Sequence, residues 1–305
     1  MSASASSAVN HRVELVEVGP RDGLQNEAAL LSTPNKVELI QRLLNAGSRR
    51  IEVASFVNPK RVPQMADAEA VLAAIPKQDN LCRIGMVLNR KGLERAIAAG
   101  CDEIGLVVVA TDTFGLKNQG MDIEQSIASC KELVPIAKAA GLTVQITISV
   151  SFGCPYEGEV DSQRVLDIAK RLVDLQPREL ALADTIGVAV PRQVQHLFDH
   201  LHAIAPAVTL RGHFHNTRNT ALASILAAYS VGVRVFDSSI GGLGGCPFAP
   251  KASGNVATED VVYALERSGI KTGLALNSLI ETSHWLQQKL NHPVPSALAR
   301  AGSFP

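Results

Sequence analysis

Two histidines near the end of an apolar run have the type and spacing of metal ligands. His213 and His215 flank Phe214, a few residues after the apolar residues 207–210. Side chains of an extended chain alternate between two faces, so both imidazoles should point one way and Phe214 the other. Such a pair is half of a metal site or a proton-transfer site, or equally two buried, hydrogen-bonded core residues. The elements that position the pair must decide between these alternatives.

Strand-like and helix-like segments alternate eight times along the chain, with short loops between them. We expect strands at residues 13–18, 50–54, 83–87, 103–109, 143–150, 179–183, 208–214 and 234–238, and helices at 33–47, 66–75, 91–99, 123–140, 163–175, 192–205, 221–231 and 258–268. Apolar strands that alternate with amphipathic helices indicate a parallel sheet covered by helices. Eight such units predict the α/β class and a TIM (β/α)8 barrel, with an additional C-terminal helix at residues 277–290. The alternative, an open doubly wound sheet, lacks its GxGxxG motif here.

Composition excludes several classes of partner. The 305 residues are 46% hydrophobic and 19% charged, with a formal net charge of zero, as in an ordinary globular protein. Without a basic cluster, nucleic acid and anionic membranes are not expected as partners, and no apolar run is long enough to span a membrane. Five cysteines without a CxxC pair indicate a reducing compartment, so we expect a cytoplasmic protein. We expect a disordered Ser/Ala-rich tail at residues 1–10 and a single catalytic domain at residues 11–305.

In a TIM barrel, the active site lies where the strands end. Arg21 and Asp22 follow the first expected strand, Glu52 lies near the end of the second, and Asn255 follows the eighth. Asp22 could complete a metal site with the two histidines, and the Asn255 carboxamide oxygen could be a fourth ligand. Nitrogen and oxygen donors with open positions suit Mg²⁺ or Mn²⁺. The Arg21 guanidinium could hold a carbonyl oxygen that becomes an enolate, although a surface ion pair with Asp22 is the alternative.

Cys246 lies in a loop that also contains glycines 241, 242, 244 and 245. Such a backbone is permissive and could close over a ligand. A thiol close to a cation or a histidine can have a lowered pKa and transfer protons. The alternatives are a small buried apolar side chain, or a glycine-rich loop that holds a phosphate.

Several longer motifs resemble those of the hydroxymethylglutaryl-CoA lyase family over residues 13 to 290. They are VGPRDGLQNE at residues 18–27, IEVASFVNPK at 51–60, CPYEG at 154–158, DTIG at 184–187, GGLGGCPFA at 241–249 and ASGNVATED at 252–260. The resemblance implies a metal-dependent TIM barrel that cleaves 3-hydroxy-3-methylglutaryl-CoA to acetyl-CoA and acetoacetate. It also implies a CoA thioester as ligand, a homodimer and a context of leucine degradation.

The same resemblance implies roles for individual residues. Asp22, His213, His215 and Asn255 are expected to bind Mg²⁺ or Mn²⁺, and the remaining expected site residues are Arg21 and Gln25 at the substrate, Glu52 in the active site and Cys246 as a proton-transfer residue. The base and the acid stay open, with Cys246 the first candidate and Asp22, His213 and Glu52 the alternatives.

One segment departs from the family pattern. After the second histidine the chain reads Asn216-Thr-Arg-Asn, where the family has Asp-Thr-Tyr-Gly or similar. Asn216 removes a negative charge and Arg218 adds a positive one, so another 3-hydroxy-3-alkylglutaryl-CoA is an alternative substrate. More distant alternatives are an acetyl-CoA-condensing synthase of the isopropylmalate or homocitrate type, and a barrel that binds a CoA ester without catalysis.

Overall fold

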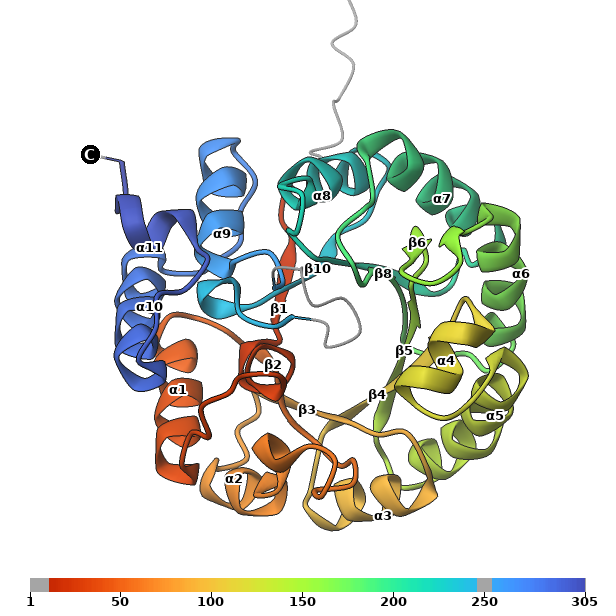
Figure 1. Cartoon of the computed structure of the whole chain (residues 1–305), viewed down its shortest axis with the longest axis horizontal. Helices are drawn as coiled ribbons and strands as arrows, with labels where there is room; N and C mark the ends of the chain where they lie inside the picture. The colour runs from red at the N-terminus through yellow and green to blue at the C-terminus, as the bar shows by residue number, and fades with distance from the viewer. Residues whose placement is uncertain (1–10, 246–253, 305) are drawn as a thin grey trace, which may run out of the picture.

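Eight parallel strands form a closed barrel in this computed structural model, which describes residues 11–245 and 254–304 (Figure 1). The strands are β1 (Glu14–Glu17), β2 (Arg50–Ser55), β3 (Cys82–Met86), β4 (Glu103–Val109), β5 (Thr143–Ser149), β8 (Glu179–Asp184), β9 (Thr209–Phe214) and β10 (Val235–Ser238). Their order around the barrel is β1-β10-β9-β8-β5-β4-β3-β2, and β1 pairs with both β10 and β2. The expected TIM barrel is therefore confirmed. The expected tail at residues 1–10 and Cys246 lie outside the described residues.

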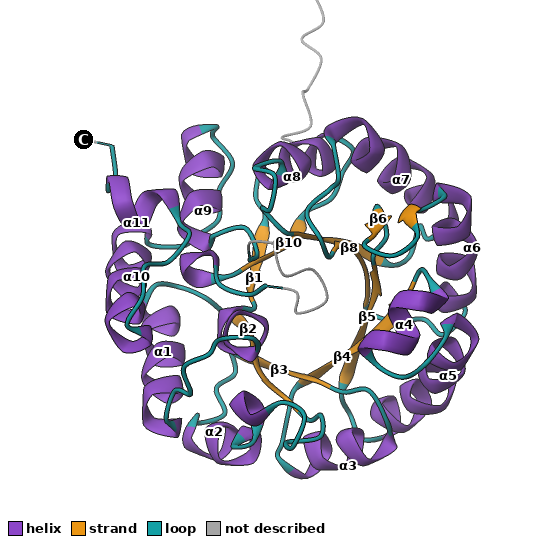
Figure 2. Ribbon diagram, viewed as in Figure 1, coloured by secondary structure: helices purple, strands orange, loops and turns teal. Residues whose placement is uncertain are grey.

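Helices surround the barrel and cover the outer face of its strands (Figure 2). They are α1 (Thr33–Asn45), α2 (Ala68–Ala74), α3 (Arg90–Ala98), α5 (Ile123–Ala139), α6 (Ser162–Val173), α7 (Pro191–Ile204), α8 (Ala221–Ser230) and α9 (Thr258–Arg267). The expected additional helix is α10 (Leu276–Leu290), which packs against α1 and α9. A short helix α11 (Ala297–Ala301), which the sequence did not predict, packs against α9 and α10.

The helix ends follow local chemistry. Asn89 and Asp161 accept hydrogen bonds from the first-turn amides of α3 and α6, and Asp122 forms a capping box with Gln125 at α5. Glycines with positive φ follow the ends of α1 and α5: Gly47 at 104° and Gly141 at 79°. These signals explain why the helix boundaries were predictable to within a few residues.

Short elements at the strand ends were not predicted. They are a turn of π-helix η1 (Gly19–Gly23), the 3-10 turns η2 (Pro63–Met65) and η3 (Ile240–Gly242), the helix α4 (Asp112–Asn118) and a small hairpin of β6 (Gly153–Cys154) and β7 (Gly158–Glu159). Segments of two to seven residues carry too few apolar positions for a periodic pattern. Several of them border the barrel mouth and shape it.

The barrel interior holds a network of ion pairs beside a small apolar cluster, whereas the main apolar core lies between strands and helices. Arg50 is buried and bonds Glu103 and Glu179, at 2.7 Å each. Arg211, equally buried, bonds Gln145 at 2.7 Å and pairs with Asp237. Buried charges are tolerated when they are paired and hydrogen-bonded, and removing one partner is strongly destabilising. We call this network the ionic floor, because it lies directly below the barrel mouth.

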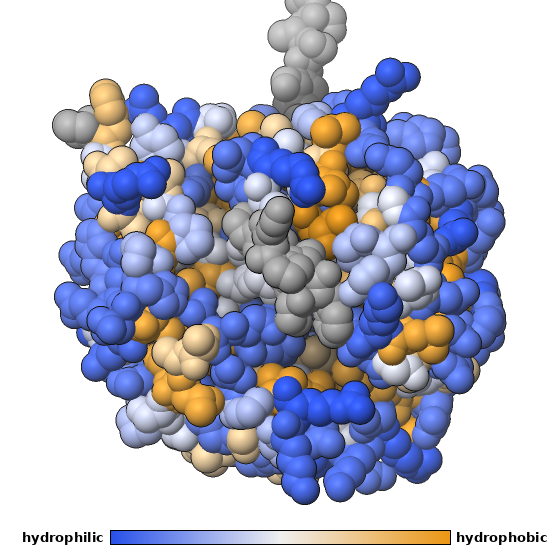
Figure 3. Space-filling view, in the orientation of Figure 1, coloured by the Kyte–Doolittle hydropathy of each residue, from blue (hydrophilic) through white to orange (hydrophobic). Residues whose placement is uncertain are grey.

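The surface is hydrophilic around the barrel mouth. Figure 3 shows polar side chains over most of this face, with apolar ones in separate groups between the helices. In the part of the chain that the structure describes, no helix has both the length and the apolar character needed to cross a membrane.

Candidate active site at the barrel mouth

The turn of π-helix η1 carries two of the expected site residues. The carbonyl oxygen of Val18 accepts hydrogen bonds from the amides of Arg21, Asp22 and Gly23, at 3.2, 2.7 and 3.2 Å. This tight turn directly follows β1, so it projects Arg21 and Asp22 at the barrel mouth. Single π-turns of this kind are frequent at functional sites.

A buried carboxylate below this turn ties it to the loop after β10. Glu17 Oε1 accepts hydrogen bonds from the amides of Gly19 and Ile240, at 2.7 and 2.9 Å, and Oε2 accepts one from Thr258. Burial raises the pKa of Glu17 from 4.5 to about 7, against the effect of these donors. Glu17 therefore couples the segment with Arg21 and Asp22 to the glycine-rich segment that precedes Cys246.

Arg21 forms ion pairs with two carboxylates. Its Nη1 lies 2.7 Å from Asp22 Oδ1 and its Nη2 lies 2.6 Å from Glu52 Oε2, in the middle of β2. Burial raises the pKa of Glu52, while Arg21, His213 and His215 lower that of Asp22 despite its burial. The Arg21 Nε is buried without a hydrogen-bond partner in the described part of the chain. The ion pair between the adjacent residues Arg21 and Asp22 therefore exists, but it lies inside the barrel mouth and not on the outer surface.

The two histidines face the same side, as their spacing predicts. The ring centroids of His213 and His215 lie 5.1 Å apart, and Phe214 points away to pack on Phe152. His213 Nδ1 lies 2.9 Å from Asp237 Oδ2, and this bond outweighs burial and raises the pKa of His213. Because Nδ1 is engaged by the carboxylate, the Nε2 of His213 faces the mouth.

Asp22, His213 and His215 bring their ligand atoms together. One donor atom of each lies within 4.8 Å of those of the other two. The side chain of Asn255 adjoins this group: its Nδ2 donates to Asp22 Oδ2 at 2.7 Å and to the Leu243 carbonyl at 3.1 Å. Its Oδ1 is left buried and without a partner in the described residues. An orphaned amide oxygen beside two imidazoles and a carboxylate fits Mg²⁺ or Mn²⁺.

The remaining expected residues are placed less completely. Gln25 lies just beyond η1, half-buried, and its Oε1 is buried with no hydrogen-bond partner among the described residues. Asn26 donates to the carbonyl of Gly245, so this segment borders the loop that leads to Cys246. Cys246 itself lies outside the described residues. Of the other cysteines, Cys101, Cys130 and Cys154 are buried and Cys82 is half-buried.

Two acidic residues at the site were not singled out from the sequence. Asp237, on β10, bonds both His213 and Arg211 and so joins the mouth to the buried network below it. Asp184, at the end of β8, accepts hydrogen bonds from the amides of Val188 and Ala189, and burial raises its pKa. Both aspartates stand at the end of a strand, and that position was the signal that could have found them.

The segment that departs from the family pattern is turned away from the metal-site group. Asn216 Oδ1 accepts a hydrogen bond from the Ala221 amide, at the start of α8. The Arg218 Nη1 donates to the carbonyls of Ile186 and Gly187, at 3.1 and 3.0 Å. The added positive charge therefore anchors the loop after β8, and the changed residue at 216 caps a helix.

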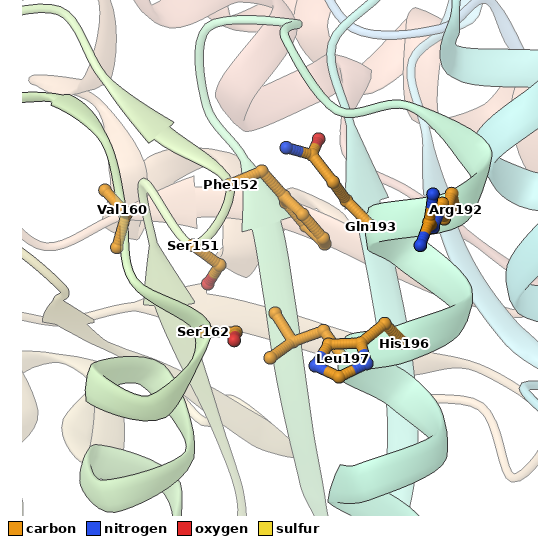
Figure 4. A pocket seen from close by; sticks show the side chains of 8 residues that line it. All are labelled: Ser151, Phe152, Val160, Ser162, Arg192, Gln193, His196 and Leu197. Carbon is orange, nitrogen blue, oxygen red and sulfur yellow. The ribbon is translucent and has the colours of Figure 1, made fainter.

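A separate cavity of about 330 Å³ lies outside the barrel (Figure 4). It is bounded by Ser151 and Phe152 after β5 and by Arg192, His196 and Leu197 of α7. Phe152 and Phe214 pack on each other, 6.0 Å between centroids, on the side of β9 away from the two histidines. The expected site residues do not line this cavity, so it is distinct from the candidate active site.

Comparisons with known proteins agree with this geometry. The HMGL-like family model matches residues 12–286. The chain is 43% identical to the (R)-citramalyl-CoA lyase of Chloroflexus aurantiacus, covering 95% of both chains. It is also 43% identical to the mitochondrial hydroxymethylglutaryl-CoA lyase of Rattus norvegicus, covering 98% of this chain and 92% of the relative.

Solved structures give the same result. An HMG-CoA lyase from Acinetobacter baumannii, in complex with coenzyme A and 3-methylmalate, superposes with a TM-score of 0.93 at 40% identity, over 98% of this chain and 99% of that one. The Bacillus subtilis HMG-CoA lyase superposes with a TM-score of 0.92 at 40% identity, over 95% and 98% of the two chains. The clustered donors and the paired arginine at the barrel mouth suit a lyase of CoA esters, and the chain belongs to the HMGL-like family of HMG-CoA lyases.

Proposed function

We propose that this lyase cleaves 3-hydroxy-3-methylglutaryl-CoA to acetyl-CoA and acetoacetate. The observation that carries the proposal is the group of Asp22, His213, His215 and the orphaned Asn255 Oδ1, placed beside the paired guanidinium of Arg21. This set combines donors for a divalent cation with a cationic fork for a developing oxyanion. Retro-Claisen cleavage of a 3-hydroxy thioester needs both.

Asp22, His213, His215 and Asn255 are the residues that would hold Mg²⁺ or Mn²⁺. When bound, the cation supplies polarisation of the C3 hydroxyl and of the free carboxylate, which lowers the pKa of the hydroxyl. Asp237 holds the His213 ring in the orientation that exposes Nε2.

The chain's own residues divide the remaining work. A base takes the proton of the C3 hydroxyl, the C2–C3 bond breaks, and its electron pair forms the enolate of acetyl-CoA. Arg21 donates to the thioester oxygen on which this charge develops. An acid then protonates C2. Cys246 is the first candidate for one proton transfer, and Asp22, His213 and Glu52 are candidates for the other; Gln25 is proposed to contact the substrate.

A second substrate, citramalyl-CoA, is favoured by one comparison. The relative named (R)-citramalyl-CoA lyase is as similar to this chain as the rat HMG-CoA lyase, at 43% identity each. Its acyl group also carries a hydroxyl, a methyl group and a free carboxylate. The same chemistry would convert it to acetyl-CoA and pyruvate.

A cleavage screen tests the proposal. Metal-stripped protein should be inactive, and Mg²⁺ or Mn²⁺ should restore acetyl-CoA release from 3-hydroxy-3-methylglutaryl-CoA above that from citramalyl-CoA and from 3-ethyl analogues. Faster release from another ester would reassign the substrate within the family. Thiol release from acetyl-CoA and a 2-oxoacid, without cleavage of any ester, would replace the lyase by a synthase.

The homodimer, the cytoplasmic location and the role in leucine degradation stay predictions. Sedimentation of the purified protein tests the first, and imaging of the tagged chain in its source cells tests the second. Growth of a deletion strain on leucine tests the third.

A further inference from the structure

The hydroxyl of Ser149 is a buried group at the end of β5. The side chain, the last of β5, is 7% exposed, and its Oγ has no hydrogen-bond partner among the described residues. Buried hydroxyls in folded proteins are nearly always hydrogen-bonded. An orphan at a strand end in a barrel mouth therefore indicates a ligand atom that completes the bond.

The direction of Ser149 follows from its strand. Gln145 of β5 bonds Arg211 of β9, with β8 between the two strands, so Gln145 points into the barrel. Side chains alternate along a strand, and Thr147 and Ser149 therefore point inward as well. In the next turn Val150 adopts a φ of 51°, which ends the alternation, and Ser151 instead lines the outer cavity.

The interior beside Ser149 is open to the mouth. Val107 of β4 and Thr147 of β5 are register partners, and they alone among the central residues of these two strands are not buried. The outer faces of both strands are covered by helices. The space that reaches Val107 and Thr147 is thus a continuation of the barrel mouth.

Ser149 lies at the depth of the proposed metal ligands. Ile148 of β5 is in register with Leu182 of β8, and Ala183 with His213. Because the strands of a barrel are tilted, a level shifts by about two residues over two strands, and Ser149 is therefore level with the second histidine, His215. Two strand spacings separate the backbones of Ser149 and His213, about 10 Å, which a short acyl group can bridge between the side chains.

The mouth has a charged half and an uncharged half. Arg21, Asp22, Glu52 and the two histidines come from β1, β2 and β9, and Arg21 is engaged by both carboxylates. The opposite wall, from β4, β5 and β8, presents small or neutral side chains: Val107, Thr147, Ser149, Ala181 and Ala183. On this wall the one buried donor without a partner is Ser149 Oγ, among the residues that the structure describes.

We propose that Ser149 donates a hydrogen bond to the free carboxylate of the acyl group, and that Val107 and Thr147 leave the space for the C3 substituent. This rests on the proposed function, which supplies a thioester with a second carboxylate. There the thioester oxygen goes to Arg21, and the hydroxyl and one carboxylate oxygen go to the proposed metal ligands. The second carboxylate oxygen then faces the neutral wall, where it needs a donor.

Binding of two uncleavable esters tests the proposal without turnover. Glutaryl-CoA carries the free carboxylate, and butyryl-CoA differs from it by the loss of that group alone. Calorimetry on the Mg²⁺-loaded wild type, Ser149→Ala and Ser151→Ala gives each dissociation constant. Ser151 is the matched control, because its hydroxyl already donates to the Ile148 carbonyl at 2.7 Å.

We expect Ser149→Ala to weaken glutaryl-CoA binding about ten-fold, the effect of one hydrogen bond to a charged group, and to leave butyryl-CoA within two-fold. Ser151→Ala should change neither constant. Unchanged glutaryl-CoA binding in Ser149→Ala, or an equal loss for both esters, overturns the proposal. A wild type that distinguishes the two esters through Ser149 but cleaves no 3-hydroxy ester refutes the proposed function alone.

Discussion

The carboxylate of Asp237 lies 2.9 Å from Nδ1 of His213 and also pairs with the buried guanidinium of Arg211. Arg211 is in turn bonded to Gln145 and lies 3.5 Å from Glu179, which binds Arg50. A chain of buried polar contacts therefore runs from the barrel interior to a proposed metal ligand. Asp237 therefore connects the ionic floor to the imidazole and restricts the orientation of the ring.

Replacing Asp237 by Asn should weaken metal binding, and it should also lower the stability of the barrel because the buried Arg211 loses a paired charge. The amide can still contact His213 but no longer carries the charge that orients the ring and raises its basicity, and such partners typically contribute 10- to 100-fold to metal affinity. We expect Mn²⁺ affinity, measured by electron paramagnetic resonance of free Mn²⁺, to fall by about ten-fold or more.

Asp102→Asn is the matched control, since Asp102 pairs with Arg83 far from the mouth. Its Mn²⁺ affinity should equal that of the wild type. Equal affinities in the Asp237 and Asp102 variants would show that His213 needs no carboxylate partner.

Arg21→Lys should reduce turnover far more than metal binding. A single ammonium cannot bond Asp22, Glu52 and a thioester oxygen together, as the planar fork of Arg21 can. Loss of one oxyanion donor typically lowers kcat by about 10²- to 10³-fold, and we expect a loss of that size with Mn²⁺ affinity within about three-fold.

The comparison is Arg95→Lys, because Arg95 forms a two-point ion pair with Glu69 on the outside of the barrel. That variant should keep wild-type kcat. Wild-type kcat in Arg21→Lys would remove the proposed oxyanion role.

The sequence predicted the barrel well because each unit repeats a strong local pattern. Buried strands such as Glu103–Val109 and amphipathic helices such as Ile123–Ala139 were placed within a residue or two. The histidine pair and the Arg21–Asp22 pair were found because each sits where a strand ends. These positions depend on local chain order alone.

The features of the site that the sequence did not predict depend on contacts between distant segments. The bond of Asp237 to His213 joins two strands, and Glu17 joins β1 to residues more than 220 positions away. The orphaned hydroxyl of Ser149 is visible only when the described residues around it have been placed. The hydrogen bond of Asn216 was hidden for the same reason, because its amide oxygen accepts from Ala221 at the start of α8.

Cys246→Ala tests the proposed proton transfer. Assayed in reductant, the variant should bind glutaryl-CoA with wild-type affinity but cleave substrate at least 100-fold more slowly, since general acid–base groups contribute about 10²- to 10⁴-fold. Near-native turnover would exclude the thiol from the reaction. Cys130→Ala, at a buried cysteine of α5, is the control and should retain turnover.

Glu17 should make the stability of the barrel depend on pH. Burial raises its pKa from 4.5 to about 7 in the folded protein, so the folded state holds this proton more tightly than the unfolded state. The stabilising effect is complete below pH 4.5 and is lost as the pH rises through 7, a difference of about 3 kcal/mol. Stability should accordingly fall between pH 5 and about pH 8 at this site.

Glu17→Gln removes the titration but keeps the hydrogen bonds, because the amide oxygen can accept from Gly19 and Ile240 while the amide nitrogen donates to Thr258. The variant should gain thermal stability relative to the wild type as the pH rises from 5 to 8, by several degrees in Tm. Differential scanning calorimetry of both proteins across this range measures the difference. A difference that stays constant with pH would mean that Glu17 is ionised throughout and that the donors from Gly19, Ile240 and Thr258 outweigh its burial.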